Sequence, residues 1–287
     1  MRDRAESLDL RKNDADKKAD LHTHTNYSDG ALSPYELIKK AHELGLEILG
    51  IVDHDTVSAI EDSIEIGSEF GVEIVPGVEL SAAIDNREIH IIGYFVDREN
   101  EGLAEYLTVS RKDRMRRAKR IVEKLNKINV PLKLEAVLEK AGSAAVGRPH
   151  IAHALLDEGL TGSYVEAFSR YIGYGGPAYE KKNSLSPEDT IALVASSGGL
   201  SFLAHPGKYT SDAVLHRLIK SGLDGIEVIH PSHTPEEVQH YNGIVDQYFL
   251  LASGGSDYHG GKRNDNGALG LYNVPTAWVK EMKKRLF

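Results

Sequence analysis

The 287-residue chain contains no cysteine. Disulfide bonds and thiolate metal sites are therefore excluded, and any metal ion must be bound by histidine, aspartate or glutamate. Ligands of these types suit manganese, iron or zinc. Long apolar runs are also missing from the sequence. None approaches the ~20 residues that a membrane-spanning helix needs, so we expect no membrane partner.

A surplus of positive charge is absent as well, because 34 Lys and Arg stand against 43 Asp and Glu, a formal net charge of −9. This balance argues against a protein that coats nucleic acid without specificity. It does not exclude a small phosphorylated substrate, because bound metal ions would reverse the charge locally. Residues 1–18 are charged and lack the apolar core of a signal peptide. We expect them to form a flexible leader and the protein to be cytoplasmic.

Helix-start signals punctuate the chain at 33–36, 186–189 and 234–237, where Ser or Thr precedes Pro and an acidic residue. Short apolar runs alternate with these helices over residues 19–98 and again over 186–275. Such alternation is typical of parallel strands with helices outside them. The sequence therefore predicts an α/β fold.

The segment 99–185 differs from its flanks, because helical periodicity replaces the alternation. We predict a helical insertion that covers the rim of a discontinuous barrel built from 19–98 and 186–287. The predicted helices of the insertion are Arg111–Lys127, Leu134–Ala141, Pro149–Glu158 and Tyr164–Tyr171.

Side chains of the metal-ligand type follow most of the apolar runs. His22 and His24 point to the same side, because side chains alternate faces along a strand. In a parallel α/β barrel, the carboxyl ends of the strands converge on the rim that carries the active site. Burying many ionisable groups there is costly unless metal cations pair them. The further candidate ligands are Asp29, His54, Glu79, His90, His205, Asp257 and His259.

The motifs, taken in order, resemble the polymerase-and-histidinol-phosphatase (PHP) superfamily from residue 19 to about 275. They are Asp20-Leu-His-Thr-His24, Ser28-Asp-Gly30, Asp53-His-Asp-Thr56, Gly77-Val-Glu79, His90, His205-Pro206 and Gly255-Ser-Asp-Tyr-His259. Asp29 and the insertion carrying Gly147-Arg-Pro-His150 resemble the nucleotidase-like phosphoesterase subgroup. The resemblance implies a distorted seven-stranded (β/α) TIM-like barrel with a helical insertion domain.

The resemblance also implies two or three divalent metal ions, which we expect to be Mn, Fe or Zn. The first site would use His22, His24, Glu79 and Asp257. Glu79 would bridge to a second site with His90 and His205, and Asp29, His54 and His259 would form a third. We expect Asp20 and Asp53 either to orient an imidazole through its other nitrogen or to cap a strand end.

Arg148 and His150 in the insertion are the candidates for binding substrate phosphate. A guanidinium matches two phosphate oxygens at once, although Arg148 would also suit a surface position opening a helix at Pro149. His230 ends a strand, where it would bind a phosphate or only make a structural hydrogen bond. His205, His230 and Asp257 are the candidate catalytic residues that protonate a leaving alkoxide, and the sequence does not rank them.

Basic residues concentrate in Arg111–Lys127, which holds nine Lys or Arg and two acidic residues. Such a stripe either follows a nucleic-acid backbone or forms a solvated helix face. We favour the solvated face, because charged outer faces of amphipathic helices are common. Neither an RNA-binding fold nor an aromatic stacking pattern supports the other interpretation. Lys262 and Arg263 would either assist an anionic substrate or belong to a solvated loop, and we favour the solvated loop.

Together these features predict a metal-dependent phosphoesterase that hydrolyses a nucleotide phosphomonoester with metal-activated hydroxide. Nucleoside 3′,5′-bisphosphate is the leading candidate substrate, and a 5′-3′ exoribonuclease acting on short oligonucleotides is the related alternative. An amidohydrolase-type metallohydrolase would also open with His-x-His, but it often uses a carboxylated lysine, and this chain has no lysine at a predicted strand end. In a non-catalytic metal-binding domain, we would expect other residues to replace some of the metal ligands, whereas the candidate ligand set of this chain is complete.

Overall fold

The computed structural model describes residues 17–84, 87–207, 210–263 and 265–286. Residues 1–16 of the predicted leader lie outside the described residues. Strand β1 (Lys17–Thr23) begins two residues before the predicted barrel boundary, so residues 17 and 18 belong to the sheet.

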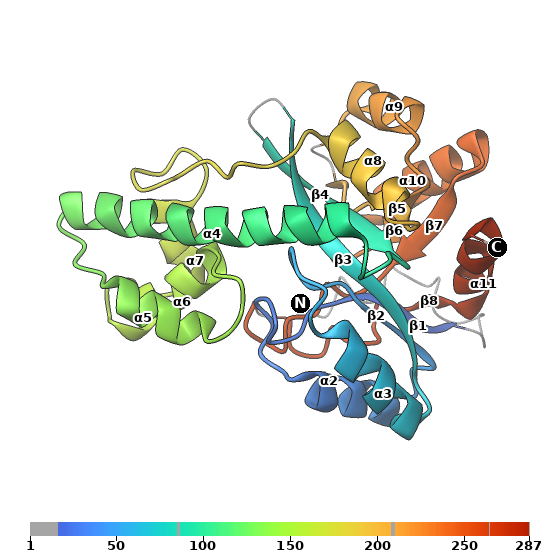
Figure 1. Cartoon of the computed structure of the whole chain (residues 1–287), viewed down its shortest axis with the longest axis horizontal. Coiled ribbons are helices and arrows are strands. Elements are labelled where there is room, and N and C mark those ends of the chain that lie inside the picture. The colour runs from blue at the N-terminus through green and yellow to red at the C-terminus, as the bar shows by residue number, and fades with distance from the viewer. Residues whose placement is uncertain (1–16, 85–86, 208–209, 264, 287) are drawn as a thin grey trace.

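A single sheet of eight strands forms the centre of the molecule, in the order β7-β6-β5-β4-β3-β2-β1-β8 (Figure 1). Seven strands were predicted, and the additional one is the two-residue β8, which pairs antiparallel to β1. A parallel bridge joins Thr23, the last residue of β1, to Tyr258 in the segment that follows β7. The strands after β1 are Ile48–Ile51 (β2), Glu73–Ile84 (β3), Arg87–Tyr94 (β4), Leu200–Leu203 (β5), Gly225–Ile229 (β6), Leu251–Gly254 (β7) and Val274–Pro275 (β8).

Strand β4 corrects the prediction that the strands of 19–98 are all parallel, because it runs antiparallel to both β3 and β5. Only two residues separate β3 from β4, too few for the crossover that a parallel pair requires. The reversal places the first half of β4 at the rim. His90 therefore lies opposite Ser81 there, although it does not end its strand.

Among the described residues, six helices belong to the barrel segments, and they lie outside the sheet (Figure 1). Ser33 and Thr234 form the predicted capping boxes, and Ser186 caps a third helix. No helix in the described part of the chain is both long and apolar enough to cross a membrane. The bounds are Pro34–Glu43 (α2), Ile60–Phe70 (α3), Pro187–Ser196 (α8), Asp212–Lys220 (α9), Pro235–Tyr248 (α10) and Thr276–Leu286 (α11).

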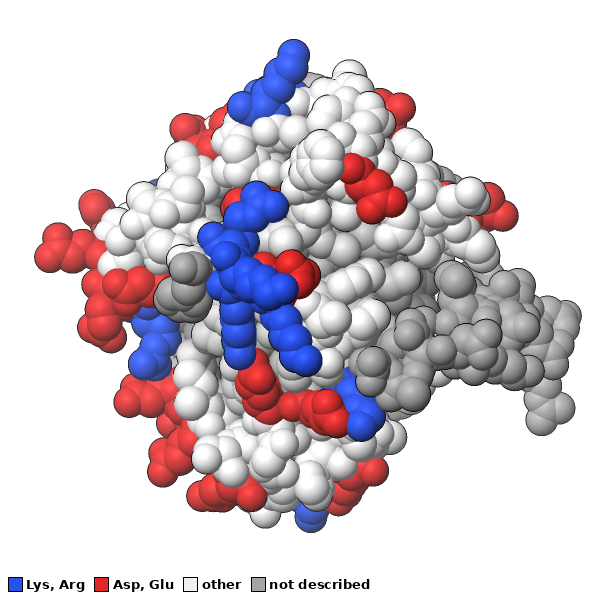
Figure 2. All heavy atoms as spheres, turned by 90° about the vertical axis from the view of Figure 1, so that its right-hand side faces the viewer, with Lys and Arg blue, Asp and Glu red and all other residues white. Residues whose placement is uncertain are grey.

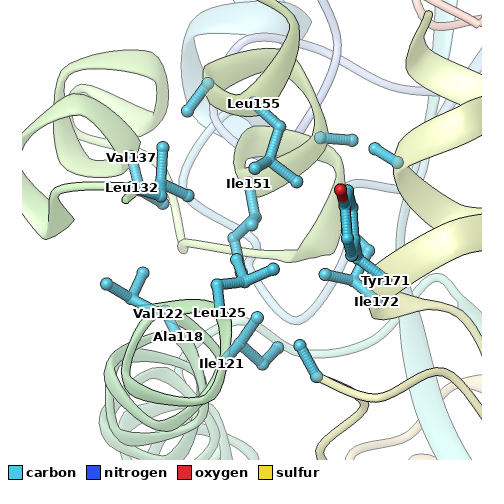
Figure 3. Close-up of a cluster of buried hydrophobic side chains, with 14 of the residues drawn as sticks. Ala118, Ile121, Val122, Leu125, Leu132, Val137, Ile151, Leu155, Tyr171 and Ile172 are labelled. Carbon is cyan, nitrogen blue, oxygen red and sulfur yellow. The ribbon is translucent and has the colours of Figure 1, made fainter. Parts of the chain in front are cut away.

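The insertion is built around one long helix, α4 (Glu101–Lys127), which extends from the sheet to the far end of the molecule (Figure 1). The predicted helix over 111–127 is the second part of α4. Its apolar stripe, including Ile121 and Leu125, packs against Ile151, Leu155 and Tyr171 in a separate core (Figure 3). The other helices are Leu134–Ala141 (α5), Arg148–Asp157 (α6), Tyr164–Ala167 (α7) and the π-helical turn Phe168–Ile172 (η2).

The surface around α11 carries paired charges. Lys and Arg gather near the middle of this face and are bordered by Asp and Glu (Figure 2). In the last turn of α11, Lys283 donates to Glu73 at 2.7 Å and Lys284 donates to Glu281 at 2.7 Å. Exposed pairs of this kind contribute about 0–1 kcal/mol each to stability, so we interpret this face as solvated surface.

Candidate active site

The four side chains predicted for the first metal site come together at the rim. The ligand atoms of His22, His24, Glu79 and Asp257 all lie within 4.8 Å of one another. His24 Nε2 lies 3.2 Å from Glu79 Oε2 and 3.1 Å from Asp257 Oδ1. The Nε2 atoms of His22 and His24 are 3.2 Å apart.

The second predicted set gathers around the other oxygen of Glu79. Glu79 Oε1 lies 2.7 Å from His90 Nδ1 and 2.9 Å from His205 Nε2. Glu79 Oε2, in contrast, faces His22, His24 and also His54. The two oxygens of one buried carboxylate thus face two ligand groups, as a bridging ligand requires.

The third predicted set, Asp29, His54 and His259, is also assembled. Its ligand atoms lie within 4.8 Å of one another, and His24 is within the same limit. His259 Nε2 and Asp29 Oδ1 are 3.3 Å apart. His24 and His54 therefore each lie within reach of two sites, which the sequence did not indicate.

Unusual backbone geometry places two of these ligands. His205 has φ 29° and Asp257 has φ 49°, in the left-handed region that non-glycine residues rarely adopt. His205 lies two residues after the end of β5, and Asp257 lies three residues after the end of β7. Such conformations cluster at functional sites where the surrounding structure enforces them.

The donor set fits divalent cations. Burial alone would lower the pKa of His24, but hydrogen bonds to Asp257 and Glu79 raise it to about 9. Burial also opposes ionisation of Glu79, yet the surrounding histidines hold its pKa well below the usual range. Buried nitrogens of His54 and His259 have no hydrogen-bond partner among the described residues. Cations between these groups would satisfy the unpaired nitrogens and the carboxylates together.

Asp20 and Asp53 hold backbone and hydroxyl groups, which supports the second of their two predicted roles, the capping of strand ends, over the orientation of an imidazole. Asp20 accepts hydrogen bonds from the backbone N–H of Ser256 at 2.9 Å and of Gly270 at 3.1 Å. Asp53 accepts from the N–H and the hydroxyl of Thr25, at 2.8 and 2.6 Å. Both carboxylates therefore fix the loops that carry the ligands.

Glu227 takes the role that was expected of Asp20, and sequence reasoning missed it. Its Oε1 lies 2.8 Å from His22 Nδ1, and its Oε2 accepts from the backbone N–H of His205 at 2.6 Å. Burial would raise its pKa, but His22 and His230 lower it to about 2. The available signal was a charged residue inside an otherwise apolar strand.

A cavity of about 320 Å³ adjoins the metal-ligand groups, and His54, His90 and Asp29 line both. We call it the arginine cavity, because four arginines line it: Arg114 and Arg117 from α4, Arg148 from α6, and Arg263 from the loop after β7. The structure thus brings the predicted phosphate ligand Arg148 to the metal-ligand rim.

Three of these arginines were predicted to lie on solvated surface, and the structure corrects this prediction. Arg263 binds the carboxylate of Asp29, so it is not part of a freely solvated loop. Arg114 and Arg117 face the arginine cavity, so α4 is not solvated along its whole basic stripe. Arg117 is only 7% exposed, and burial lowers its pKa to about 10. Its Nη2 has no hydrogen-bond partner among the described residues.

Two carboxylates balance part of this charge. Asp55 Oδ2 accepts from Arg114 Nε at 2.8 Å and also from the buried Lys182. Glu88 Oε2 accepts from Arg148 Nη2 at 3.1 Å, and its Oε1 lies 3.5 Å from His90 Nε2. Glu88 therefore connects a metal-ligand histidine to the phosphate candidate Arg148.

The remaining candidates occupy different surroundings. His150 Nδ1 accepts from the N–H of Gly147 at 3.0 Å and so caps α6, and burial lowers its pKa to about 4. His230 lies beside His205, with ring centroids 5.1 Å apart, and its Nε2 is 3.7 Å from Asp257 Oδ2. The three candidate catalytic residues are thus neighbours.

Comparisons with known proteins agree with this geometry. The family model described as "PHP domain" matches residues 20–127. The 5′-3′ exoribonuclease Rnm of Escherichia coli strain K12 is 36% identical over 247 residues, which are 84% of this chain and 84% of that protein. The 3′,5′-nucleoside bisphosphate phosphatase of Chromobacterium violaceum is 30% identical over 246 residues, 84% of this chain and 86% of that protein.

Solved structures share the fold. A protein from Bifidobacterium adolescentis, whose structure was assigned as a metal-dependent phosphoesterase, superposes with a TM-score of 0.87. It is 33% identical in sequence, and the match covers 93% of this chain and 96% of that one. The likeness therefore extends over the insertion as well as the barrel.

Proposed function

Because this chain belongs to the PHP domain family and is a metal-dependent phosphoesterase, we propose that it hydrolyses a nucleotide phosphoester next to a second phosphate group. Nucleoside 3′,5′-bisphosphate is the first candidate substrate. The observation that carries the proposal is the arginine cavity, which shares Asp29, His54 and His90 with the metal-ligand groups. A substrate with one phosphoester at the metal ions would extend directly into it.

The three ligand groups would hold two or three divalent ions, for which Mn, Fe and Zn are the candidates. Bound there, the ions would supply a hydroxide nucleophile at neutral pH and Lewis-acid stabilisation of the phosphoryl oxygens. Glu227 would orient His22 through its second ring nitrogen, as partners of metal ligands do.

The arginines of the cavity would bind the phosphate that does not react. Arg148 presents a guanidinium that is held by Glu88 and remains partly exposed. Arg117 Nη2 forms no hydrogen bond among the described residues and lies 3.7 Å from Glu88 Oε2, and Arg114 is anchored on Asp55. Because a guanidinium binds phosphate through two parallel hydrogen bonds, these side chains would fix the substrate's orientation.

His230 is the candidate that we favour for protonating the leaving alkoxide. Its buried Nε2 has no hydrogen-bond partner among the described residues, and His230 is not a member of the metal-ligand groups found there. Asp257 belongs to the first ligand group, and His205 Nε2 lies 2.9 Å from Glu79 Oε1. The Ser232 hydroxyl, 2.8 Å from Nδ1, would fix the orientation of the His230 ring.

The alternatives receive less support. Lys182 is buried, as a carboxylated lysine would be, but it lies in the segment after η2 and binds Asp55, which disfavours amidohydrolase chemistry. A non-catalytic domain would not need the complete ligand set. An oligonucleotide substrate is the second candidate, and the aromatic side chains of the insertion favour it.

Phosphate release from adenosine 3′,5′-bisphosphate and from AMP would test the proposal, with Arg148→Ala as the variant. We expect Arg148→Ala to keep its metal content but to lose about 10²-fold in kcat/KM on the bisphosphate, with a smaller loss on AMP. Arg148→Lys should restore activity only in part. Arg170→Ala is the matched control, because Arg170 is an exposed arginine of the same insertion. Near wild-type kinetics of Arg148→Ala on both substrates would contradict the phosphate role.

A further inference from the structure

The insertion carries four aromatic side chains that form a continuous row with Arg148. The rings of Tyr164 and Phe168 are 5.2 Å apart, and those of Tyr179 and Tyr174 are 5.5 Å apart. Arg148 joins the two pairs, because its guanidinium carbon lies 5.9 Å from the Phe168 ring and 6.0 Å from the Tyr179 ring. These distances are within the range of cation–π contacts.

This aromatic row begins inside the arginine cavity and continues beyond it. Tyr164, Phe168 and Arg148 line the cavity, whereas Tyr179 and Tyr174 are not among its lining residues. Tyr174 ends the row with 72% of its surface exposed. The row therefore connects the metal-ligand rim with open solvent.

We propose that the aromatic row is a stacking platform for the bases of a single-stranded oligonucleotide whose terminal nucleotide occupies the arginine cavity. The inference rests on the proposed function and assigns base-binding residues to its second candidate substrate. Every base presents a π face, so aromatic rings bind unpaired bases with little sequence preference. Paired bases in a duplex would not expose their faces to Tyr174 and Tyr179.

Cations for the oligonucleotide backbone lie along the same part of the insertion. Arg117 Nε donates to the backbone oxygen of Glu180 at 2.8 Å, so α4 lies directly against the segment that carries Tyr179. Arg120 and Lys124 both pair with the Glu180 carboxylate, at 2.9 and 2.7 Å. Two exposed cations thus share one carboxylate, which leaves positive charge for a phosphate.

These contacts argue against the prediction that the basic stripe on α4 is only a solvated helix face. The prediction of a solvated face depends on how common charged outer faces are on amphipathic helices and on the lack of an aromatic pattern beside the stripe in the sequence. The fold supplies that pattern from a different part of the chain, because it brings Tyr179 beside Arg117 and Lys124. Basic groups beside stacked aromatic rings are the usual combination in single-strand binding sites.

The test uses a 5′-phosphorylated RNA trinucleotide and adenosine 3′,5′-bisphosphate as parallel substrates. Tyr174→Ala should raise KM for the trinucleotide by about 5- to 100-fold, the range for loss of one base–aromatic stack. Activity on the bisphosphate should stay within about twofold, because Tyr174 lies outside the cavity. Tyr174→Phe should behave like wild type, and Tyr35→Ala is the control, since Tyr35 is an exposed tyrosine of α2.

Several results would overturn the inference. One is that the wild-type enzyme hydrolyses the bisphosphate but neither cleaves nor binds the trinucleotide. This result would leave the proposed function intact. Equal losses on both substrates in Tyr174→Ala, or no loss on either, would also overturn it. If neither substrate is hydrolysed, the proposed function fails separately. Fluorescence anisotropy with a labelled trinucleotide then decides the inference, which requires weaker binding by Tyr174→Ala.

Discussion

Removal of the Asp55 carboxylate should destabilise the protein strongly. Asp55 is 2% exposed and adopts φ 50° directly after the ligand His54. Its Oδ2 accepts hydrogen bonds from Arg114 of α4 and from Lys182, which is 3% exposed. One buried carboxylate therefore joins the barrel to two cations of the insertion.

The expected magnitude follows from the burial of all three groups. Burial would raise the pKa of Asp55, but Arg114 and Lys182 hold it far below the usual range, so the group is ionised at neutral pH. Asp55→Ala leaves both cations without this partner. Loss of one member of a buried ion pair costs about 3–5 kcal/mol, which corresponds to a fall in Tm of roughly 6–20 °C for a protein of about this size.

Thermal unfolding followed by circular dichroism would measure this effect. The exposed Asp246 of α10 provides the control, and Asp246→Ala should change Tm by less than about 2 °C. The double variant Asp55→Ala/Lys182→Met should be more stable than Asp55→Ala by about 1 kcal/mol or more, because one orphaned charge is removed. A Tm of Asp55→Ala close to that of wild type, or strictly additive losses in the double variant, would refute the reasoning.

Three further predictions concern the rim and α6. His24→Ala and Asp257→Ala should each abolish turnover, and the double variant should be little worse than either, because residues that act as a unit are not additive; additive losses in kcat would place them in separate sites. Glu227→Gln should weaken metal binding about 10- to 100-fold through His22, measured by titration of metal-depleted protein, and unchanged affinity would contradict its orienting role. Burial holds the pKa of His150 at about 4, below its unfolded value of ~6.5. Below pH ~6.5 the unfolded chain therefore binds a proton at this residue before the folded protein does. The folded protein keeps its full stability above pH ~6.5 and loses up to about 3 kcal/mol as the pH falls toward 4. Urea unfolding across this range should show a flatter pH dependence for His150→Asn, and identical profiles would count against the assignment.

The clustering of the candidate metal ligands at the rim was largely predictable from the sequence, because most of them follow strand ends. His22 and His24 share a face through strand alternation, and Asp257 and His259 follow an apolar run. The insertion was predictable for a related reason, since the stripe on α4 has helical periodicity. Predictions of this type depend only on local spacing and on the general geometry of a barrel.

The reversal of β4 and the partners of the ligands required the three-dimensional structure. The pair Asp85-Asn86 between two apolar runs was an available turn signal, which the prediction of parallel strands missed. Glu227 and Glu88 act through residues distant in sequence, His22 and Arg148.

The basic stripe of α4 shows the same limit. Arg114 and Arg117 look like solvated helix residues, because their sequence spacing does not show which side of α4 faces the barrel. Packing of the insertion against the rim turns this side into the wall of a cavity.

Metal content and nucleotide phosphatase activity, measured together on the same purified protein, test the central claim most directly. We predict at least two transition-metal ions per chain, phosphate release from adenosine 3′,5′-bisphosphate, loss of that activity with a chelator, and its return when Mn²⁺ or Zn²⁺ is added. Less than about one metal ion per chain, together with phosphate release that is indifferent to the chelator, would contradict the assignment of the rim as a metal-dependent phosphoesterase site.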